Sequence, residues 1–116
     1  MKAILSEIIG EQYPIISEEF IEVGNYTDYY KFLDCEIFTC VSTFYKGEEL
    51  SIFVDDEGLL KPNYGRMVAN YPEPLFGNIV ICGGVDDEGN TLDIPESIRI
   101  TDLEEIVSAI RYETRG

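Results

Sequence analysis

The chain has 116 residues, 45% of them hydrophobic and 12% aromatic, and its 23 acidic and 8 basic side chains give a net charge of −15. This length indicates a single domain, residues 1–116, that can bury a core without disulfides or a structural metal, and the apolar content excludes intrinsic disorder. The acidic excess disfavours binding to nucleic-acid phosphates or anionic membranes, which requires clustered Lys and Arg, and it favours a basic partner.

The residue types that the chain lacks exclude several kinds of catalytic and metal-binding site. The chain has no histidine, which excludes Ser-His-Asp and Cys-His mechanisms and the commonest transition-metal sites. We interpret Cys35, Cys40 and Cys82, which are odd in number and form no C-x-x-C motif, as reduced core residues. Glu7 stands where a signal peptide needs apolar residues, and no apolar run approaches about 18 residues. These features predict a cytoplasmic protein with neither enzymatic activity nor a cofactor.

Apolar patterns predict the elements of the N-terminal half. Residues 3–9 are expected to form a strand, and residues 13–23, which include several acids, a looser strand at the edge of a sheet. A short helix is expected near 27–34, because four apolar side chains there can share one side: Tyr29, Tyr30, Phe32 and Leu33. These aromatics could form a binding surface, but core packing is the simpler explanation.

A hairpin and a central strand follow. Residue types alternate from Cys35 to Tyr45, residues 46–49 supply a turn, and Leu50–Asp55 returns as the partner strand, so residues 35–55 are predicted to form a β-hairpin. The continuous apolar run Ile79–Cys82 predicts a buried central strand.

Prolines at 62, 72 and 74 make residues 61–75 the longest irregular segment, in which residues 66–71 form one helical turn at most. This segment brings polar, aromatic and basic side chains together, so we consider it a candidate contact surface. The simpler explanation is a loop that covers one edge of the sheet.

The C-terminal residues predict a helix near 101–112. Thr101 and Glu104 have the spacing of a capping box, and apolar side chains recur at helical intervals after them. Together these elements predict an α+β domain with a mainly antiparallel sheet of four or five strands and two helices.

The sequence Asp-Asp-Glu-Gly occurs twice, once after Val54 and once after Val85. Carboxylates can bind Ca²⁺, but an EF-hand register starting at Asp86 fails, because its sixth residue is Thr91 and its twelfth is Ser97. Ordinary turn chemistry is the simpler explanation, since Asp supports turns through its side chain and Gly accepts positive φ.

The acids can also act collectively. Residues two apart on a strand are separated by about 6.7 Å, comparable to two base steps of a DNA strand, so a sheet with acidic rims can imitate phosphates. Asp86, Asp87 and Glu88 are expected to join the earlier acids at one rim; the alternative is that the charges only solvate the protein. The candidate partner-binding residues are Glu48, Glu49, Asp55, Asp56, Glu57, Asp86, Asp87, Glu88, Asn63, Tyr64 and Arg66.

The runs LSIFVDDEGLLKPN and LFGNIVICGGVDDEG, followed by TLDIPESI, resemble a family of small domains of unknown function carried by phages, plasmids and other mobile elements of bacteria. The resemblance covers residues 20–100. Leu60, Pro62 and Asn63 match the family's L-x-P-N pattern, and Gly77 and Asn78 match its G-N step. The resemblance implies no catalytic residue, but it implies a setting in which small acidic proteins act as accessory or counter-defence factors.

These observations predict an acidic interaction protein of a phage or mobile element. It would bind a basic surface of a host nucleic-acid-processing or defence protein, as an inhibitor or a nucleic-acid mimic. One alternative is a small-ligand or metal-ion binding module at the two Asp-Asp-Glu-Gly turns. Another is a homodimeric structural accessory protein that associates through its tyrosines and an exposed sheet edge.

Overall fold

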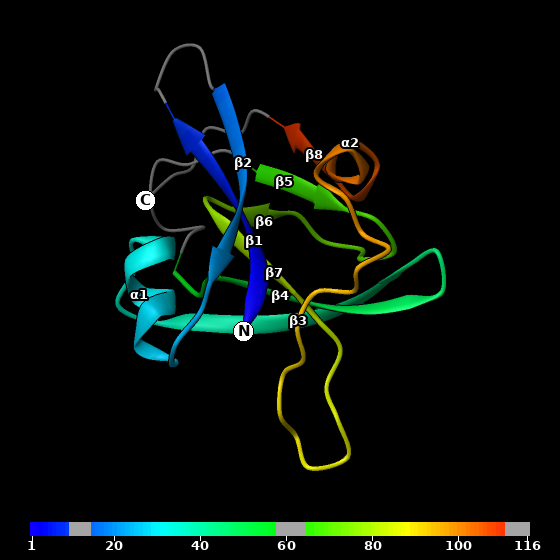
Figure 1. The fold of residues 1–116 in the computed structure, drawn as a ribbon. Coiled ribbons are helices and arrows are strands. Elements are labelled where there is room, and N and C mark those ends of the chain that lie inside the picture. The colour runs from blue at the N-terminus through cyan, green and yellow to red at the C-terminus, as the bar shows by residue number, and fades with distance from the viewer. Residues whose placement is uncertain (10–14, 58–64, 111–116) are drawn as a thin grey trace.

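A computed structural model describes residues 1–9, 15–57 and 65–110 (Figure 1). Five strands form one sheet and three form a smaller one, so the predicted α+β class is confirmed. The elements in chain order are β1 (Lys2–Ile9), β2 (Ile15–Glu22), α1 (Thr27–Leu33), β3 (Phe38–Tyr45), β4 (Glu48–Asp55), β5 (Gly65–Val68), β6 (Leu75–Phe76), β7 (Ile79–Gly83), the 3-10 helix η2 (Ile100–Asp102), α2 (Leu103–Ile106) and β8 (Val107–Ile110).

The larger sheet has the strand order β2-β1-β7-β4-β3, and each strand is antiparallel to its neighbours. β7 lies in the centre, and all five of its residues are buried. Because β1 and β4 occupy both of its edges and the protein covers both of its faces, apolar and small residues are required along its whole length. The predictions of a central strand here and of an edge strand at β2 are both confirmed.

β3 and β4 form the predicted hairpin. Their residues pair one to one from Phe38 opposite Asp55 to Tyr45 opposite Glu48. Lys46 and Gly47 make the turn with φ values of 51° and 80°, which is the type I′ geometry that matches the twist of two antiparallel strands. The turn is therefore two residues long, and β4 begins earlier than the predicted Leu50.

The two faces of the larger sheet are covered differently. One face packs against the smaller sheet and α2 around a core that includes Ile52, Ile81 and Leu103. The opposite face packs against α1, where the ring of Tyr29 stacks on Phe53 with centroids 4.1 Å apart. Figure 1 shows α2 and the smaller sheet on one side of the large sheet and α1 on the other. The helix near 27–34 and the core role of its buried side chains are confirmed.

The C-terminal helix is shorter than predicted. Helix α2 ends at Ile106, and Val107–Ile110 forms strand β8, which pairs with β5. The expected capping box of Thr101 and Glu104 is not formed; instead, Asp102 Oδ2 accepts a hydrogen bond of 2.9 Å from the backbone N–H of Arg99. Residues 66–68 likewise belong to β5 and not to a helical turn. The pairing of β5 with β8 satisfies backbone groups that a continued helix would have bonded internally.

The cysteines differ in their environments. Cys82 is buried on β7, and Cys35 is half-buried, whereas Cys40 is exposed on β3, outside both core clusters. The prediction of a core position is therefore wrong for Cys40, which lies on the edge strand β3. None of the helices in the described ranges is long and apolar enough to cross a membrane.

Candidate interaction surfaces

The two Asp-Asp-Glu-Gly turns lie at opposite ends of the larger sheet. Each follows the C-terminal end of its strand, and β4 and β7 are antiparallel neighbours, with Leu50 opposite Gly83 and Val54 opposite Ile79. At a rise of about 3.4 Å per residue, Glu49 and Asp55 are about 20 Å apart along β4. The second acidic turn therefore joins Glu48 and Glu49 at one rim, but the expectation that it also joins the first acidic turn there is wrong.

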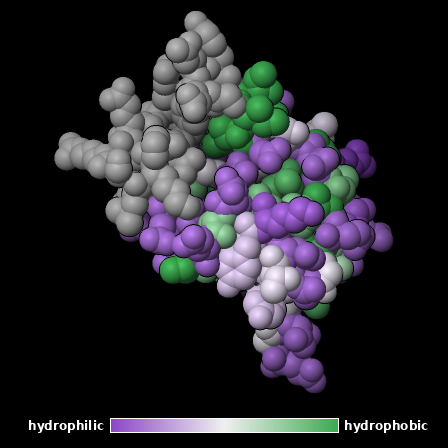
Figure 2. Space-filling view, turned by 90° about the vertical axis from the view of Figure 1, so that its left-hand side faces the viewer, coloured by the Kyte–Doolittle hydropathy of each residue, from purple (hydrophilic) through white to green (hydrophobic). Residues whose placement is uncertain are grey.

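The first acidic group, the hairpin-end acids, consists of Glu48, Glu49, Asp86, Asp87 and Glu88. A methyl group added at Gly84 would lie 3.1 Å from the Glu49 side chain, so Glu49 contacts the base of the loop that carries the other three acids. This loop projects from the body of the protein, and its tip is hydrophilic (Figure 2). Asp87 and Glu88 are exposed there.

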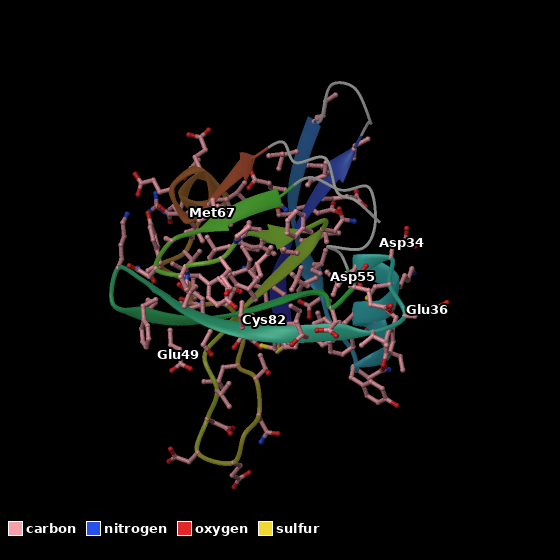
Figure 3. All side chains as sticks on the ribbon, turned by 180° about the vertical axis from the view of Figure 1, so that it is seen from behind. Asp34, Glu36, Glu49, Asp55, Met67 and Cys82 are labelled. Atoms are coloured by element: carbon pink, nitrogen blue, oxygen red, sulfur yellow. The ribbon has the colours of Figure 1, made fainter. Side chains whose placement is uncertain are left out.

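The second group, the helix-end acids, consists of Asp34, Glu36, Asp55, Asp56 and Glu57. Asp34 ends α1 with a φ of 51°, and the backbone N–H of Asp56 donates to Ile37 O at 3.0 Å. The connection from α1 to β3 therefore lies beside the end of β4. Figure 3 shows Asp34, Glu36 and Asp55 at this end of the sheet and Glu49 far from them.

Asp34 and Glu36 were not among the predicted site residues. The signal that could have found them is the hairpin register. With Phe38 opposite Asp55, the residues just before Phe38 must lie beside those just after Asp55.

The first aspartate of each turn has a structural role. Asp55 Oδ1 accepts from the backbone N–H of Glu57 at 2.9 Å, and Asp86 Oδ1 accepts in the same way from Glu88 at 2.9 Å and from Asn90 at 2.8 Å. These backbone donors, that of Asn90 foremost, lower the pKa of Asp86. The geometry is the one that turn chemistry predicts. Among the described residues, no group of three or more His, Cys, Asp or Glu side chains is arranged to hold a metal ion.

Few of the acids are neutralised by a nearby cation. Within residues 1–9, 15–57 and 65–110, two ion pairs are formed: the amino group of Met1 with Glu22 at 3.3 Å, and Lys46 Nζ with Asp102 Oδ1 at 3.5 Å. Neither pair involves a hairpin-end acid. This end of the larger sheet therefore carries a concentration of negative charge, and the helix-end acids gather a second set of carboxylates at the opposite end.

Arg66 is not at the surface. It lies on β5 with 1% of its surface exposed, and its guanidinium donates to Ser6 O at 3.0 Å and to Ser6 Oγ. Burial lowers the pKa of Arg66 to about 10, so the side chain remains charged at neutral pH. Its Nε has no hydrogen-bond partner among the residues that the structure describes. Burial also raises the pKa of Glu18, which faces Ser6 across the strand pair, and the charge of Arg66 partly offsets that effect.

The predicted contact surface on residues 61–75 is thus only partly described. Asn63 and Tyr64 lie outside the described residues, and the expectation that Arg66 belongs to an exposed loop is wrong. Asn70, from the same segment, is exposed, and its Nδ2 donates to Phe44 O at 2.6 Å. It therefore holds the β5–β6 connection against β3.

A shallow hollow of about 250 Å³ lies where β1 and β2 meet the segment before α2. Lys2 Nζ lies 4.4 Å from the ring centroid of Phe20 within it. Its lining residues are Lys2, Phe20, Ile94, Pro95, Glu96, Ile98, Arg99 and Ile100. The hollow is smaller than the usual pocket for a small ligand, about 300–1,000 Å³, and it includes neither Asp-Asp-Glu-Gly turn.

The chain was compared with protein families, curated proteins and solved structures. A family model described as a domain of unknown function, DUF3846, matches residues 1–108. No curated protein and no solved structure matches the chain. Since the match extends over all of the strands and helices except the last residues of β8, the chain belongs to the DUF3846 family of domains of unknown function.

Proposed function

We propose that this protein is a non-enzymatic binding module whose two acidic ends engage a basic surface of a partner protein. The observation that carries the proposal is the gathering of acidic side chains at the two ends of the larger sheet, where the five hairpin-end acids form no ion pair within the described residues. A net charge of −15 on 116 residues disfavours the folded state through self-repulsion, and a basic partner relieves that repulsion on binding.

The spacing of the acids defines the partner surface. The hairpin-end and helix-end acids are about 20 Å apart along β4, so the partner needs either two positive patches at this distance or a continuous positive groove. Long-range attraction between such surfaces speeds encounter and makes association sensitive to salt.

The finer form of the proposal concerns the identity of the partner. A separation of about 20 Å corresponds to about six base steps of a nucleic-acid strand at 3.4 Å each. A groove that normally holds such a strand is therefore a suitable target, as in a host nucleic-acid-processing or defence protein. The protein would act there as an inhibitor or a nucleic-acid mimic in the service of a phage or mobile element.

Three matched variants, each with four fewer negative charges, test the proposal. The hairpin-end variant carries Glu48→Gln, Glu49→Gln, Asp87→Asn and Glu88→Gln, and the helix-end variant carries Asp34→Asn, Glu36→Gln, Asp56→Asn and Glu57→Gln. Asp55 and Asp86 are kept because their carboxylates hold the turns. The control changes exposed acids elsewhere, namely Glu19, Glu73, Glu96 and Glu104, to Gln.

Affinity capture from a host lysate, followed by titration of the purified partner, measures the outcome. Wild type and control are expected to bind the same basic protein, each end variant to bind it at least tenfold more weakly, and the wild-type complex to weaken between about 50 and 300 mM salt. If the control loses affinity as much as the end variants, only net charge matters and the proposed surface is wrong. A complex that persists at high salt would also contradict the proposal.

A further inference from the structure

We propose that the free edge of β3 is a docking site for an extended basic segment of the partner, which adds to the larger sheet as a sixth strand. This inference rests on the proposed function, because it specifies how the basic partner is held between the two acidic ends. Its evidence is nevertheless separate: it comes from backbone geometry and from the composition of one strand.

The hairpin register determines which backbone groups of β3 point outward. Tyr45 and Glu48 flank a two-residue turn and exchange hydrogen bonds, so the odd-numbered residues of β3 bond to β4 and the even-numbered residues point away from it. Two contacts agree with this assignment. The carbonyl of Ile37 accepts from Asp56 N–H on the β4 side, and the carbonyl of Phe44 accepts from Asn70 on the outer side.

Between those two contacts the edge is open. Within the described residues, no hydrogen bond uses the backbone N–H or C=O groups of Cys40 or Ser42, and both residues are exposed. These groups form a row that an extended chain can pair with, which is how peptides add to sheet edges. Phe44, at one end of the row, is 57% exposed and supplies an apolar contact beside it.

β3 also lacks the features that normally protect an edge strand. Its sequence, FTCVSTFY, contains no charged residue and no proline, and its eight residues pair with β4 without a bulge. The opposite edge strand, β2, has Glu18, Glu19 and Glu22 among its eight residues. Charges on an edge strand prevent pairing with other chains. One edge of the sheet is therefore protected and the other is not.

The charges around β3 specify the occupant. The helix-end acids lie beyond Phe38, and the hairpin-end acids lie beyond Tyr45, while Lys46, in the turn that follows β3, is paired with Asp102. A strand of about eight residues with Lys or Arg at both ends and small or apolar residues between them is complementary to this arrangement. A second copy of the chain is not, because antiparallel pairing of two β3 strands would bring the helix-end acids of one copy beside the hairpin-end acids of the other.

Synthetic peptides test the inference directly. The probe has alternating valine and threonine flanked by two lysines at each end; one comparison peptide has glutamates in place of the lysines, and another has a central proline. Binding is followed by amide chemical shifts of ¹⁵N-labelled protein. We expect the basic probe to shift the amides of residues 38–45 and the two comparison peptides to bind at least tenfold more weakly.

Two substitutions on β3 supply the matched variants. Ser42→Pro removes an outward N–H that has no partner within the described part of the chain, so the fold should persist while the probe loses at least tenfold in affinity. Ser42→Lys repels the basic probe without altering the backbone, and it serves if the proline variant does not fold. Ser42→Ala is the control and is expected to bind as wild type does.

The outcomes distinguish this inference from the proposed function. If the proline-containing peptide binds as well as the probe, or if Ser42→Pro binds the probe as wild type does, attraction to the acids operates without strand addition and only the inference is overturned. If the probe pairs with β3 equally well in the hairpin-end and helix-end variants, the proposed role of the acids is wrong. The inference is also overturned if no peptide binds, or if a dimer that Ser42→Pro abolishes occupies the edge.

Discussion

Substituting Gly83 at the end of β7 should destabilise the protein far more than the same change at its neighbour Gly84. A Cβ atom at Gly83 would overlap the carbonyl oxygen of Asp93 and lie 3.1 Å from that of Leu92. Both obstacles are backbone atoms of the chain segment that returns from the projecting loop, so no side-chain rotation removes the clash. At Gly84 the obstacle is the Glu49 side chain at 3.1 Å, which can turn aside.

The cost of Gly83→Ala can be estimated from the contacts that must move. Inserting a methyl group into a closely packed site costs about 1–3 kcal/mol. Displacing the returning segment also weakens two hydrogen bonds, Gly83 N–H to Leu92 O at 2.9 Å and Leu92 N–H to Gly84 O at 2.8 Å, each contributing about 1 kcal/mol. Alanine also lowers the conformational entropy of the unfolded chain, which offsets about 0.4–1 kcal/mol of this destabilisation. We expect a loss of about 3 kcal/mol in the free energy of unfolding.

Thermal and urea denaturation, followed by circular dichroism, measure this difference. For a domain of 116 residues, an unfolding entropy of about 2.1 cal/mol/K per residue converts 3 kcal/mol into a Tm decrease of about 12 °C. Gly84→Ala is expected to cost less than about 1 kcal/mol, because only a flexible side chain must move. A Gly83→Ala variant within about 0.5 kcal/mol of wild type would refute the packing argument.

Three further predictions concern the charged groups. Arg66→Met should change the free energy of unfolding by less than about 1.5 kcal/mol, because the guanidinium is buried and forms no ion pair within the described residues, so removing it offsets the hydrogen bonds lost at Ser6. Arg66→Ala should cost about 3 kcal/mol through the cavity it leaves. Urea denaturation measures both values, and a Met variant as unstable as the Ala variant would contradict the argument. Backbone N–H donors lower the pKa of Asp86 and Asp102 from 3.8. The stabilising contribution of these two carboxylates is therefore present above pH 3.8 and is lost as pH falls through the pKa of the folded state. Carboxyl NMR titrations should give midpoints below 3.8, and higher midpoints would contradict these hydrogen bonds. Finally, raising salt from about 20 to 500 mM should raise Tm, since screening relieves self-repulsion; a lower Tm would show that attractive pairs dominate.

Elements defined by local pattern could be predicted from the sequence. Ile79–Cys82 is apolar throughout because it is buried on both faces, and the alternation along Phe38–Tyr45 follows from a strand whose two faces differ in exposure, although that strand begins later than the predicted Cys35. Both patterns arise within the strand itself, so they indicate its type and burial without any knowledge of its neighbours.

Features that depend on distant pairing could not be predicted in the same way. Val107 and Ile110 fit a helical period as well as a strand, and what makes them a strand is the pairing with β5, about 40 residues earlier. Arg66 looked like a surface residue because Ser6, to which its guanidinium donates, is 60 residues away. The separation of the two acidic turns likewise depends on the pairing of β4 with β7, which neither strand's composition reveals.

The central position of β7 also determines the order in which the sheet can assemble. The β1–β2 and β3–β4 hairpins each join neighbouring segments of the chain, but β7 pairs Ile81 with Ile4 on one side and with Ile52 on the other. During synthesis, the inner edges of β1 and β4 therefore stay open until residue 83 has been made. Closing such long loops costs conformational entropy before the contacts of β7 can compensate for it, and this makes folding slow. We therefore expect folding in milliseconds to seconds, with the insertion of β7 between the preformed hairpins as the rate-limiting step.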